Sequence, residues 1–305
     1  MNENMIFNEM FVLFILMLLG FCAFKWKLLD LEMNRKLSRL ILTVTSPALI
    51  LASVSQGNSD DKARVYYILL IAVLMYLLLP LIAIILNKVL FIPKNEDKLY
   101  RFMTVFSNIG FMGFPVIASI YGDEAIFYAS IFNLMFNICL YSYGVYIMNS
   151  KKEKKVKMDL KLLLNPGIIA ATAALIIFLT NIPIPYAFSR SLSLVGNITT
   201  PMAMMIIGST LGSMPIRNIF NDSRVYLYTF VRQLVLPLIT WLLLKNFITD
   251  PFVLGLSVII SAMPVGITAV MFSNEYGQDA ELAARGVFIT TLASFITIPI
   301  ITILF

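Results

Sequence analysis

The chain has 305 residues, of which 59% are hydrophobic and 13% are charged, and its mean hydropathy is +0.87. Soluble domains usually carry about 25% charged residues, so this composition excludes an ordinary soluble protein. The net charge is +6 and there is no histidine, which removes the usual proton shuttle, the commonest metal ligand and most serine- or cysteine-based catalysis.

Ten apolar segments follow one another along the chain, each long enough to cross a bilayer as a helix. They are 6–24, 36–56, 64–87, 99–121, 124–149, 161–180, 186–212, 223–246, 251–273 and 280–304. We therefore predict an all-α membrane protein with ten transmembrane helices. Glu3 and Glu9, and no basic residue, accompany the start of the first segment, so we expect a membrane helix there and not a cleaved signal peptide.

Connections that are rich in basic residues alternate along the chain with connections that are poor in them. Most of the 23 lysines and arginines lie in the connections that follow odd-numbered segments, and the run KKEKKVKMD at 151–159 is the densest. Because cytoplasmic loops carry the excess of lysine and arginine, we predict a multi-pass protein of the cytoplasmic membrane with both termini outside. This pattern indicates that the basic residues set the orientation of the protein in the membrane and contact anionic lipid, and it excludes nucleic acid as a partner.

Two short stretches of the first half return in the second half. TSPA at 45–48 resembles TTPM at 199–202, and YGDEA at 121–125 resembles YGQDA at 276–280. Both matches have nearly the same offset, which spans five segments. Because five is odd, the second copy must be inverted relative to the first.

We therefore predict two inverted five-helix repeats, 1–150 and 161–305, joined by a basic cytoplasmic loop at 151–160. Inverted repeats are typical of secondary transporters, whose substrate site lies at the repeat interface near the membrane midplane.

Matching glycine and proline clusters interrupt the fourth and ninth segments. The residues concerned are Gly110, Gly113 and Pro115 in the fourth segment, and Pro264, Gly266 and Thr268 in the ninth. Proline removes a backbone donor and glycine adds backbone freedom, so both segments are predicted to break. Paired breaks indicate a transporter binding site, where half-helix N-termini would face an anion. The alternative is that the prolines only kink the helices.

Three polar residues stand out inside the apolar segments. Asn108 is a candidate to contact the substrate or to cap a half-helix, and the alternative is a bond that only packs helices. Asn137, on one face with Asn133, could line the same cavity or join helices. Arg232 could attract an anion, bond to carbonyls at a helix break, or extend back to the cytoplasm. No acidic residue lies near the middle of a segment, which disfavours ion coupling through a carboxylate.

Two blocks of sequence resemble the auxin efflux carrier family. NIGFMGFP at 108–115 followed by Tyr121-Gly122 is similar to the family's N-x-x-x-M-G-I-P…Y-G block, and AMPVGI at 262–267 with FSNEY at 272–276 is similar to its A-L-P-x-G-I…F-x-x-E-Y. Arg232 with Pro237 resembles a further motif of the eighth segment.

This resemblance implies an inverted 5+5 fold in which the broken fourth and ninth helices cross, an elevator-like motion, and a substrate contact from Asn108. The long cytoplasmic loop of the plant carriers is absent, and Gly167 replaces a second substrate-site asparagine. The resemblance therefore points to a bacterial-type member that carries small carboxylates such as malate or malonate.

We predict a secondary transporter of a small organic anion, with no metal site and no cofactor. Three alternatives stay open: a sodium-coupled symporter of larger amphipathic anions, an intramembrane enzyme, and a channel or sensor. The lack of histidine and of an intramembrane acid pair argues against the enzyme. Coupling to Na⁺ or H⁺, the direction of transport and assembly into a homodimer are left open.

Overall fold

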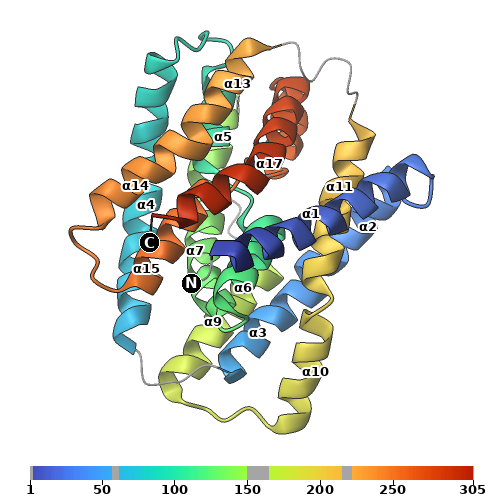
Figure 1. The fold of residues 1–305 in the computed structure, drawn as a ribbon, viewed down its shortest axis with the longest axis vertical. Helices are drawn as coiled ribbons and strands as arrows, with labels where there is room; N and C mark the ends of the chain where they lie inside the picture. Colours follow the sequence, from blue (N-terminus) through green and yellow to red (C-terminus); the bar gives the residue numbers. More distant parts are fainter. Residues whose placement is uncertain (1–2, 57–61, 150–164, 215–221, 305) are drawn as a thin grey trace. The chain divides into compact units, whose positions relative to one another are not determined.

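The computed structural model describes residues 3–56, 62–149, 165–214 and 222–304, and within them the chain is helical, with one isolated β-bridge and no strand. The helical elements are α1 (Glu3–Lys25), α2 (Leu31–Leu40), η1 (Ile41–Thr45), α3 (Ser46–Gln56), α4 (Lys62–Val89), α5 (Asp97–Val105), η2 (Ile109–Gly113), α6 (Phe114–Tyr121), α7 (Ala125–Cys139), η3 (Leu140–Gly144), α8 (Val145–Met148), α9 (Pro166–Thr180), α10 (Tyr186–Gly196), α11 (Thr199–Ser213), α13 (Ser223–Phe230), η5 (Val231–Val235), α14 (Leu236–Leu244), α15 (Pro251–Ala262), α16 (Thr268–Tyr276) and α17 (Ala280–Thr302) (Figure 1). The η elements are single π-helical turns, each of which runs directly into the α-helix that follows it.

The lengths of these helices confirm an all-α membrane protein. In the described ranges, 7 helical stretches are long and apolar enough to cross a membrane. Three shorter apolar helices, Ile109–Tyr121, Pro166–Thr180 and Pro251–Ala262, fall within the predicted fourth, sixth and ninth segments. The predicted basic loop 151–160 lies outside the described residues.

One helix starts earlier than predicted. The second predicted segment began at residue 36, but α2 begins at Leu31, because the side chain of Asp30 accepts a hydrogen bond of 2.7 Å from the amide of Met33. Such an N-cap satisfies an amide that the first turn leaves free. The stretch is polar, so a hydropathy criterion excluded it. Asp279 caps α17 in the same way, because its side chain accepts a hydrogen bond of 2.9 Å from the amide of Leu282.

The chain divides into two compact units, and unit 1 comprises Met1–Leu69, Ile109–Leu134 and Leu164–Met214. In this unit α1 packs against α11, and it crosses in front of α11 in Figure 1. Their backbones touch because glycines remove the intervening side chains: a Cβ on Gly208 would overlap the carbonyl of Met17, and one on Gly20 would overlap that of Met205. α3 packs against α9 and α10 in the same unit.

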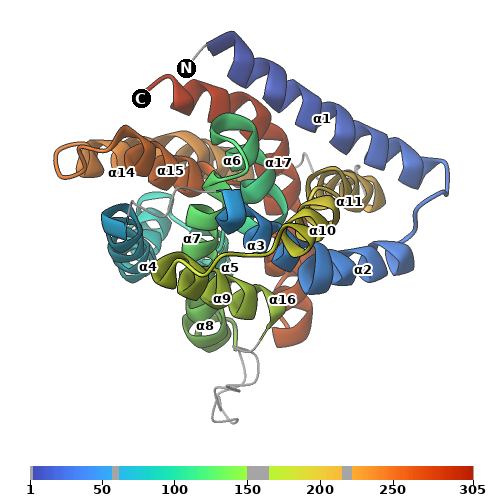
Figure 2. The same cartoon turned by 90° about the horizontal axis from the view of Figure 1, so that it is seen from below.

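Unit 2 comprises Leu70–Asn108, Met135–Leu163 and Pro215–Phe305. Here α14 packs beside α15, and α17 contacts α13, α15 and α16 (Figures 1 and 2). Each unit takes residues from both predicted repeats, so the compact units do not coincide with 1–150 and 161–305. The inverted repeat is a statement about sequence symmetry and stays a prediction.

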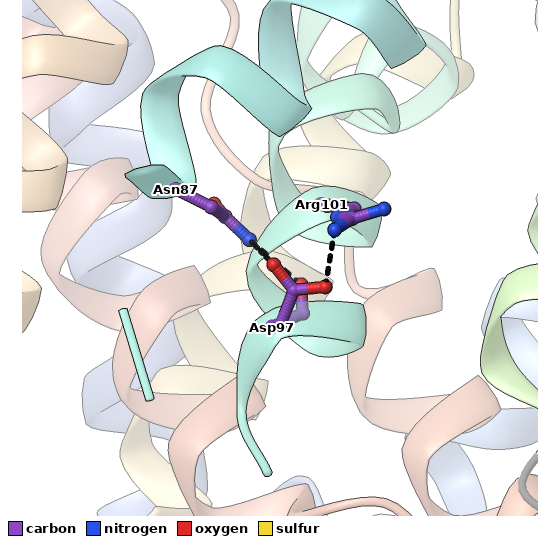
Figure 3. Close-up of polar contacts among 3 residues, drawn as sticks. All are labelled: Asn87, Asp97 and Arg101. Atoms are coloured by element: carbon purple, nitrogen blue, oxygen red, sulfur yellow. Dashed lines mark hydrogen bonds and ion pairs between the residues drawn. The ribbon is translucent and has the colours of Figure 1, made fainter. Parts of the chain in front are cut away.

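A polar cluster fixes the start of α5 in unit 2. The amide nitrogen of Asn87, near the end of α4, donates to the backbone carbonyl of Asp97 at 2.8 Å and to its carboxylate at 2.9 Å (Figure 3). One turn further on, Arg101 forms an ion pair of 2.6 Å with the other carboxylate oxygen of Asp97. These bonds fix the first turn of α5 against the end of α4. The position of α5 in turn places residues 106–108, which follow its last residue.

Candidate functional site at the paired helix breaks

The fourth segment is broken, but the break lies at residues 106–108, before the cluster of Gly110, Gly113 and Pro115 that predicted it. α5 ends at Val105, its C-cap Phe106 is extended with φ −102° and ψ 92°, and the helix resumes only at Ile109. Pro115 is the second residue of α6, directly after the π-helical turn η2, so it lies inside the helix that resumes at Ile109. Asn108 belongs to unit 2, whereas Gly110, Gly113 and Pro115 belong to unit 1.

The ninth segment is broken as predicted, and this break lies wholly in unit 2. α15 ends at Ala262, its C-cap Met263 has ψ 142°, and α16 begins at Thr268. Pro264 stands in the extended stretch between the two helices, where the amide that it lacks is not needed for a helical bond.

The two breaks pair with each other through their backbones. Ser107 and Val265 form an antiparallel bridge. The amide of Asn108 donates to the carbonyl of Pro264 at 2.8 Å, and the amide of Gly266 donates to that of Phe106 at 3.1 Å. Main-chain groups freed by the breaks are thereby satisfied without water, as an apolar environment demands. We call this pairing, residues 106–108 with 264–266, the crossover.

The crossover explains why residue 266 is glycine. A Cβ there would lie 3.3 Å from the carbonyl oxygens of both Phe106 and Ser107, and 2.9 Å from the hydroxyl of Thr268. The approach of one backbone to another, and not a special φ, requires the missing side chain.

Arg232 binds to both sides of the crossover. It lies in η5, its side chain is 1% exposed, and it donates to the carbonyl of Ser261 at 2.6 Å and to the hydroxyl of Ser107 at 2.5 Å. Ser261 is in the last turn of α15, whose carbonyls have no helical partner and carry the negative end of the helix dipole. Of the three roles that the sequence left open, the structure therefore shows the bond to a carbonyl at a helix break.

Two further polar residues brace the crossover, and the sequence analysis missed both. The hydroxyl of Thr290, in α17, accepts a hydrogen bond of 3.0 Å from the amide of Val265. The side chain of Gln233 donates to the carbonyl of Thr290 at 2.7 Å. A glutamine directly after Arg232 in an apolar run was a usable signal for Gln233, whereas nothing distinguishes Thr290 from the other threonines of its segment.

The crossover leaves several hydrogen-bonding atoms unused. Among the described residues, Asn108 Nδ2, Arg232 Nε, Gln233 Oε1 and Thr268 Oγ1 are buried without a partner. Two of these atoms, on Asn108 and Arg232, are donors only, which suits a carboxylate. A buried polar atom without a partner calls for an explanation, and a ligand is one.

Asn137 follows a residue that packs against the crossover. It is half-buried on α7, beside Phe136, whose ring packs edge-to-face on Phe106 at 5.7 Å between centroids. The structure thus brings together Asn108, Pro264, Gly266 and Arg232, and places Asn137 on a neighbouring helix of unit 2. Gly110 lies in unit 1, where a Cβ would meet nothing within 4 Å.

Comparison with known proteins gives one consistent result. A family model described as membrane transport protein matches the chain over residues 5–159 and 155–302. An uncharacterized transporter of Methanocaldococcus jannaschii is 23% identical over 95% of both chains. One of Methanothermobacter thermautotrophicus is 23% identical over 94% of both, and the uncharacterized transporter YfdV of Escherichia coli is 20% identical over 96% of this chain and 95% of its own.

Proposed function

The chain belongs to the auxin efflux carrier family of membrane transport proteins, and from this membership we propose that it is a secondary transporter that moves a small carboxylate across the cytoplasmic membrane. We propose further that it does so by elevator-type alternating access, without a cofactor or coupled ion. Membership in a transporter family, together with apolar helices along the described chain, makes it a multi-pass membrane protein.

One observation carries the choice of an anion: a buried arginine lies at the crossover and no carboxylate of the described residues pairs with it. A charge buried in a membrane protein is costly and usually faces a partner or a transport pathway. Because the direct contacts of Arg232 are neutral oxygens, an anionic substrate would supply the missing counter-charge.

Asn108 is the second proposed contact. Its side chain is 5% exposed, its backbone is held by Pro264, and its amide nitrogen has no partner among the described residues. A carboxylate would accept from this nitrogen while Arg232 supplies charge. Pro264 holds the backbone of Asn108, and Ser107 and Ser261 hold Arg232, before the substrate arrives. Little ordering cost is therefore left for binding.

The test is counterflow of radiolabelled carboxylates in proteoliposomes that contain the purified protein. Asn108→Ala is expected to raise the half-saturating concentration roughly 10- to 100-fold, because a hydrogen bond to a charged group contributes about 1.5–3 kcal/mol. Asn87→Ala is the matched control: that asparagine is 3% exposed and also in unit 2, but it bonds to Asp97, so its loss should lower thermal stability and leave substrate affinity unchanged.

Unchanged affinity in Asn108→Ala would remove that residue from the site, and absence of counterflow for every acid tested would refute the transporter itself. Replacement of Na⁺ by N-methylglucamine separates the alternative. A sodium-coupled symporter of larger amphipathic anions would stop, whereas the proposed carrier would continue at the same rate.

A further inference from the structure

Arg232 carries the one charge that is buried in the part of the chain that the structure describes. It lies inside the apolar stretch Ser223–Leu244, roughly 13 Å along the helix from its first residue at about 1.5 Å per residue. A guanidinium keeps its proton in proteins, so this positive charge does not depend on pH.

The surroundings of Arg232 do not cancel the charge. It donates to the carbonyl of Ser261 and the hydroxyl of Ser107, the phenol of Tyr228 is a further hydrogen-bond partner, and none of these groups is an acid. The ion pairs described in unit 2 are made elsewhere: Asp97 pairs with Arg101, Glu96 with Arg224, and Glu281 with Arg285. Without substrate, the site at the crossover therefore carries one uncompensated positive charge.

We propose that Arg232 makes this site select a singly charged carboxylate, so that the loaded carrier is electrically neutral at the crossover and the empty carrier is positive. The inference rests on the proposed function, because it needs a site that reorients across the membrane. One negative charge cancels the guanidinium. A second negative charge would be left without a partner in an apolar environment, where it is costly.

This charge assignment determines which step responds to the membrane potential. The loaded site crosses as a neutral pair, so the potential does not act on it. The empty site is positive, and a negative cell interior draws it inward, where it can bind another anion. A full elementary charge crossing roughly 100 mV shifts the equilibrium roughly 50-fold, so the cycle favours export.

The experiment measures exchange and net efflux separately, because exchange does not require the empty carrier to reorient across the membrane. Proteoliposomes with purified protein receive radiolabelled acids in matched pairs of equal carbon number, butyrate with succinate and propionate with malonate, at neutral pH. Valinomycin and a potassium gradient set the potential. The expected result is saturable exchange of the monocarboxylates that does not change with potential, net efflux that accelerates when the interior is negative, and weak exchange of the dicarboxylates. Acidification, which gives malonate a single charge, should increase its exchange.

Two substitutions connect the pattern to Arg232. Arg232→Lys keeps the charge, so exchange of monocarboxylates should stay independent of potential. Arg232→Gln leaves the loaded site negative, so exchange should slow roughly three- to fourfold at roughly 100 mV of either sign. Arg285→Gln is the control, since that arginine is paired with Glu281, and it should behave like the wild type.

The possible failures can be told apart. If no acid is exchanged, the proposed transport function is wrong and this inference goes with it. If exchange occurs but dicarboxylate dianions are preferred, or if wild-type exchange of monocarboxylates slows with potential, transport stands and the charge assignment is overturned. Should Arg232→Gln fail to fold, the comparison of mono- with dicarboxylates on the wild-type protein decides the question alone.

Discussion

At the scale of single residues, the crossover depends on side chains that satisfy backbone groups left free by the breaks. Thr290 is the clearest case: its hydroxyl accepts from the amide of Val265 and donates to the carbonyl of Gly286 at 2.6 Å. One hydroxyl thus joins α17 to the extended stretch between α15 and α16. Gln233 adds a second bond, to the carbonyl of Thr290 itself.

Thr290→Val keeps the shape of the side chain and removes the acceptor. The amide of Val265 would then be buried without a partner, which costs about 1–3 kcal/mol. We expect a lower melting temperature in detergent and slower counterflow, measured by a fluorescence melting curve and by the exchange assay. Thr290→Ser keeps the hydroxyl and should restore both; a valine variant with wild-type stability and exchange would contradict the bracing role.

The residues of the site differ in how far sequence reveals them. Pro264 and Gly266 were predictable because glycine and proline change backbone behaviour wherever they stand, and Asn108 was predictable because a carboxamide in an apolar segment is conspicuous. Thr290 and Ser107 were not, because hydroxyl residues in membrane helices commonly bond to their own helix, as Thr290 also does with Gly286. Ser261 was not either, because it binds Arg232 through a backbone carbonyl, which every residue carries. Their partners at the crossover are distant in the sequence and become neighbours only in the folded protein.

At the scale of helices, the two units use glycine in different ways. In unit 2, Gly266 admits another extended backbone. In unit 1, the glycines of α1 and α11 bring two regular helices into contact, a common device where apolar side chains gain nothing by avoiding lipid. Lys25, in the last turn of α1, adds a hydrogen bond of 2.9 Å to the carbonyl of Gly212.

A graded pair of substitutions tests this packing. A Cβ on Gly208 would overlap the Met17 carbonyl and lie 2.9 Å from the Phe21 amide nitrogen, whereas one on Gly212 has no neighbour closer than 3.3 Å. Gly208→Ala is therefore expected to destabilise the protein markedly, and Gly212→Ala only slightly, in thermal unfolding in detergent. Equal melting temperatures for the two variants would show that α1 and α11 can separate without cost.

At this scale, the break in the ninth segment was predicted correctly, and it follows from the local chemistry of Pro264 and Gly266. The fourth segment is also broken, but before its glycine and proline cluster, and the start of α2 was not predicted. The start of α2 depends on a cap by Asp30 in a polar stretch, which hydropathy cannot detect. The π-helical turns, such as η5 around Arg232, also lacked a signal, because they arise where a helix accommodates its tertiary neighbours.

At the scale of the whole molecule, the ten-helix topology with both termini outside is a prediction from charge distribution. Single cysteines in a background without Cys22 and Cys139 test it with a membrane-impermeant maleimide. Tyr186→Cys, at an 82% exposed position that begins α10, should react in intact cells. Lys94→Cys, an exposed position between α4 and α5, should react only after permeabilisation. Reaction of both in intact cells would refute the prediction that an odd number of spans separates the two positions.

The division into two compact units could not be predicted from the repeats, because each unit combines elements of both halves of the chain. Sequence symmetry describes how the halves resemble each other. Compactness depends instead on which helix faces match, and that follows from features such as the glycines of α11 and the hydroxyls of α17.

The crossover also imposes an order on the making of this protein. The amide of Asn108 finds its acceptor on Pro264, about 150 residues later in the chain. At a synthesis rate of about 5–20 residues per second, the first break waits on the order of 10–30 s with its main-chain groups unpaired. During that interval, water or the insertion machinery must satisfy the free main-chain groups of the fourth segment. The first half of the chain therefore completes its hydrogen bonds only after the last third has been made.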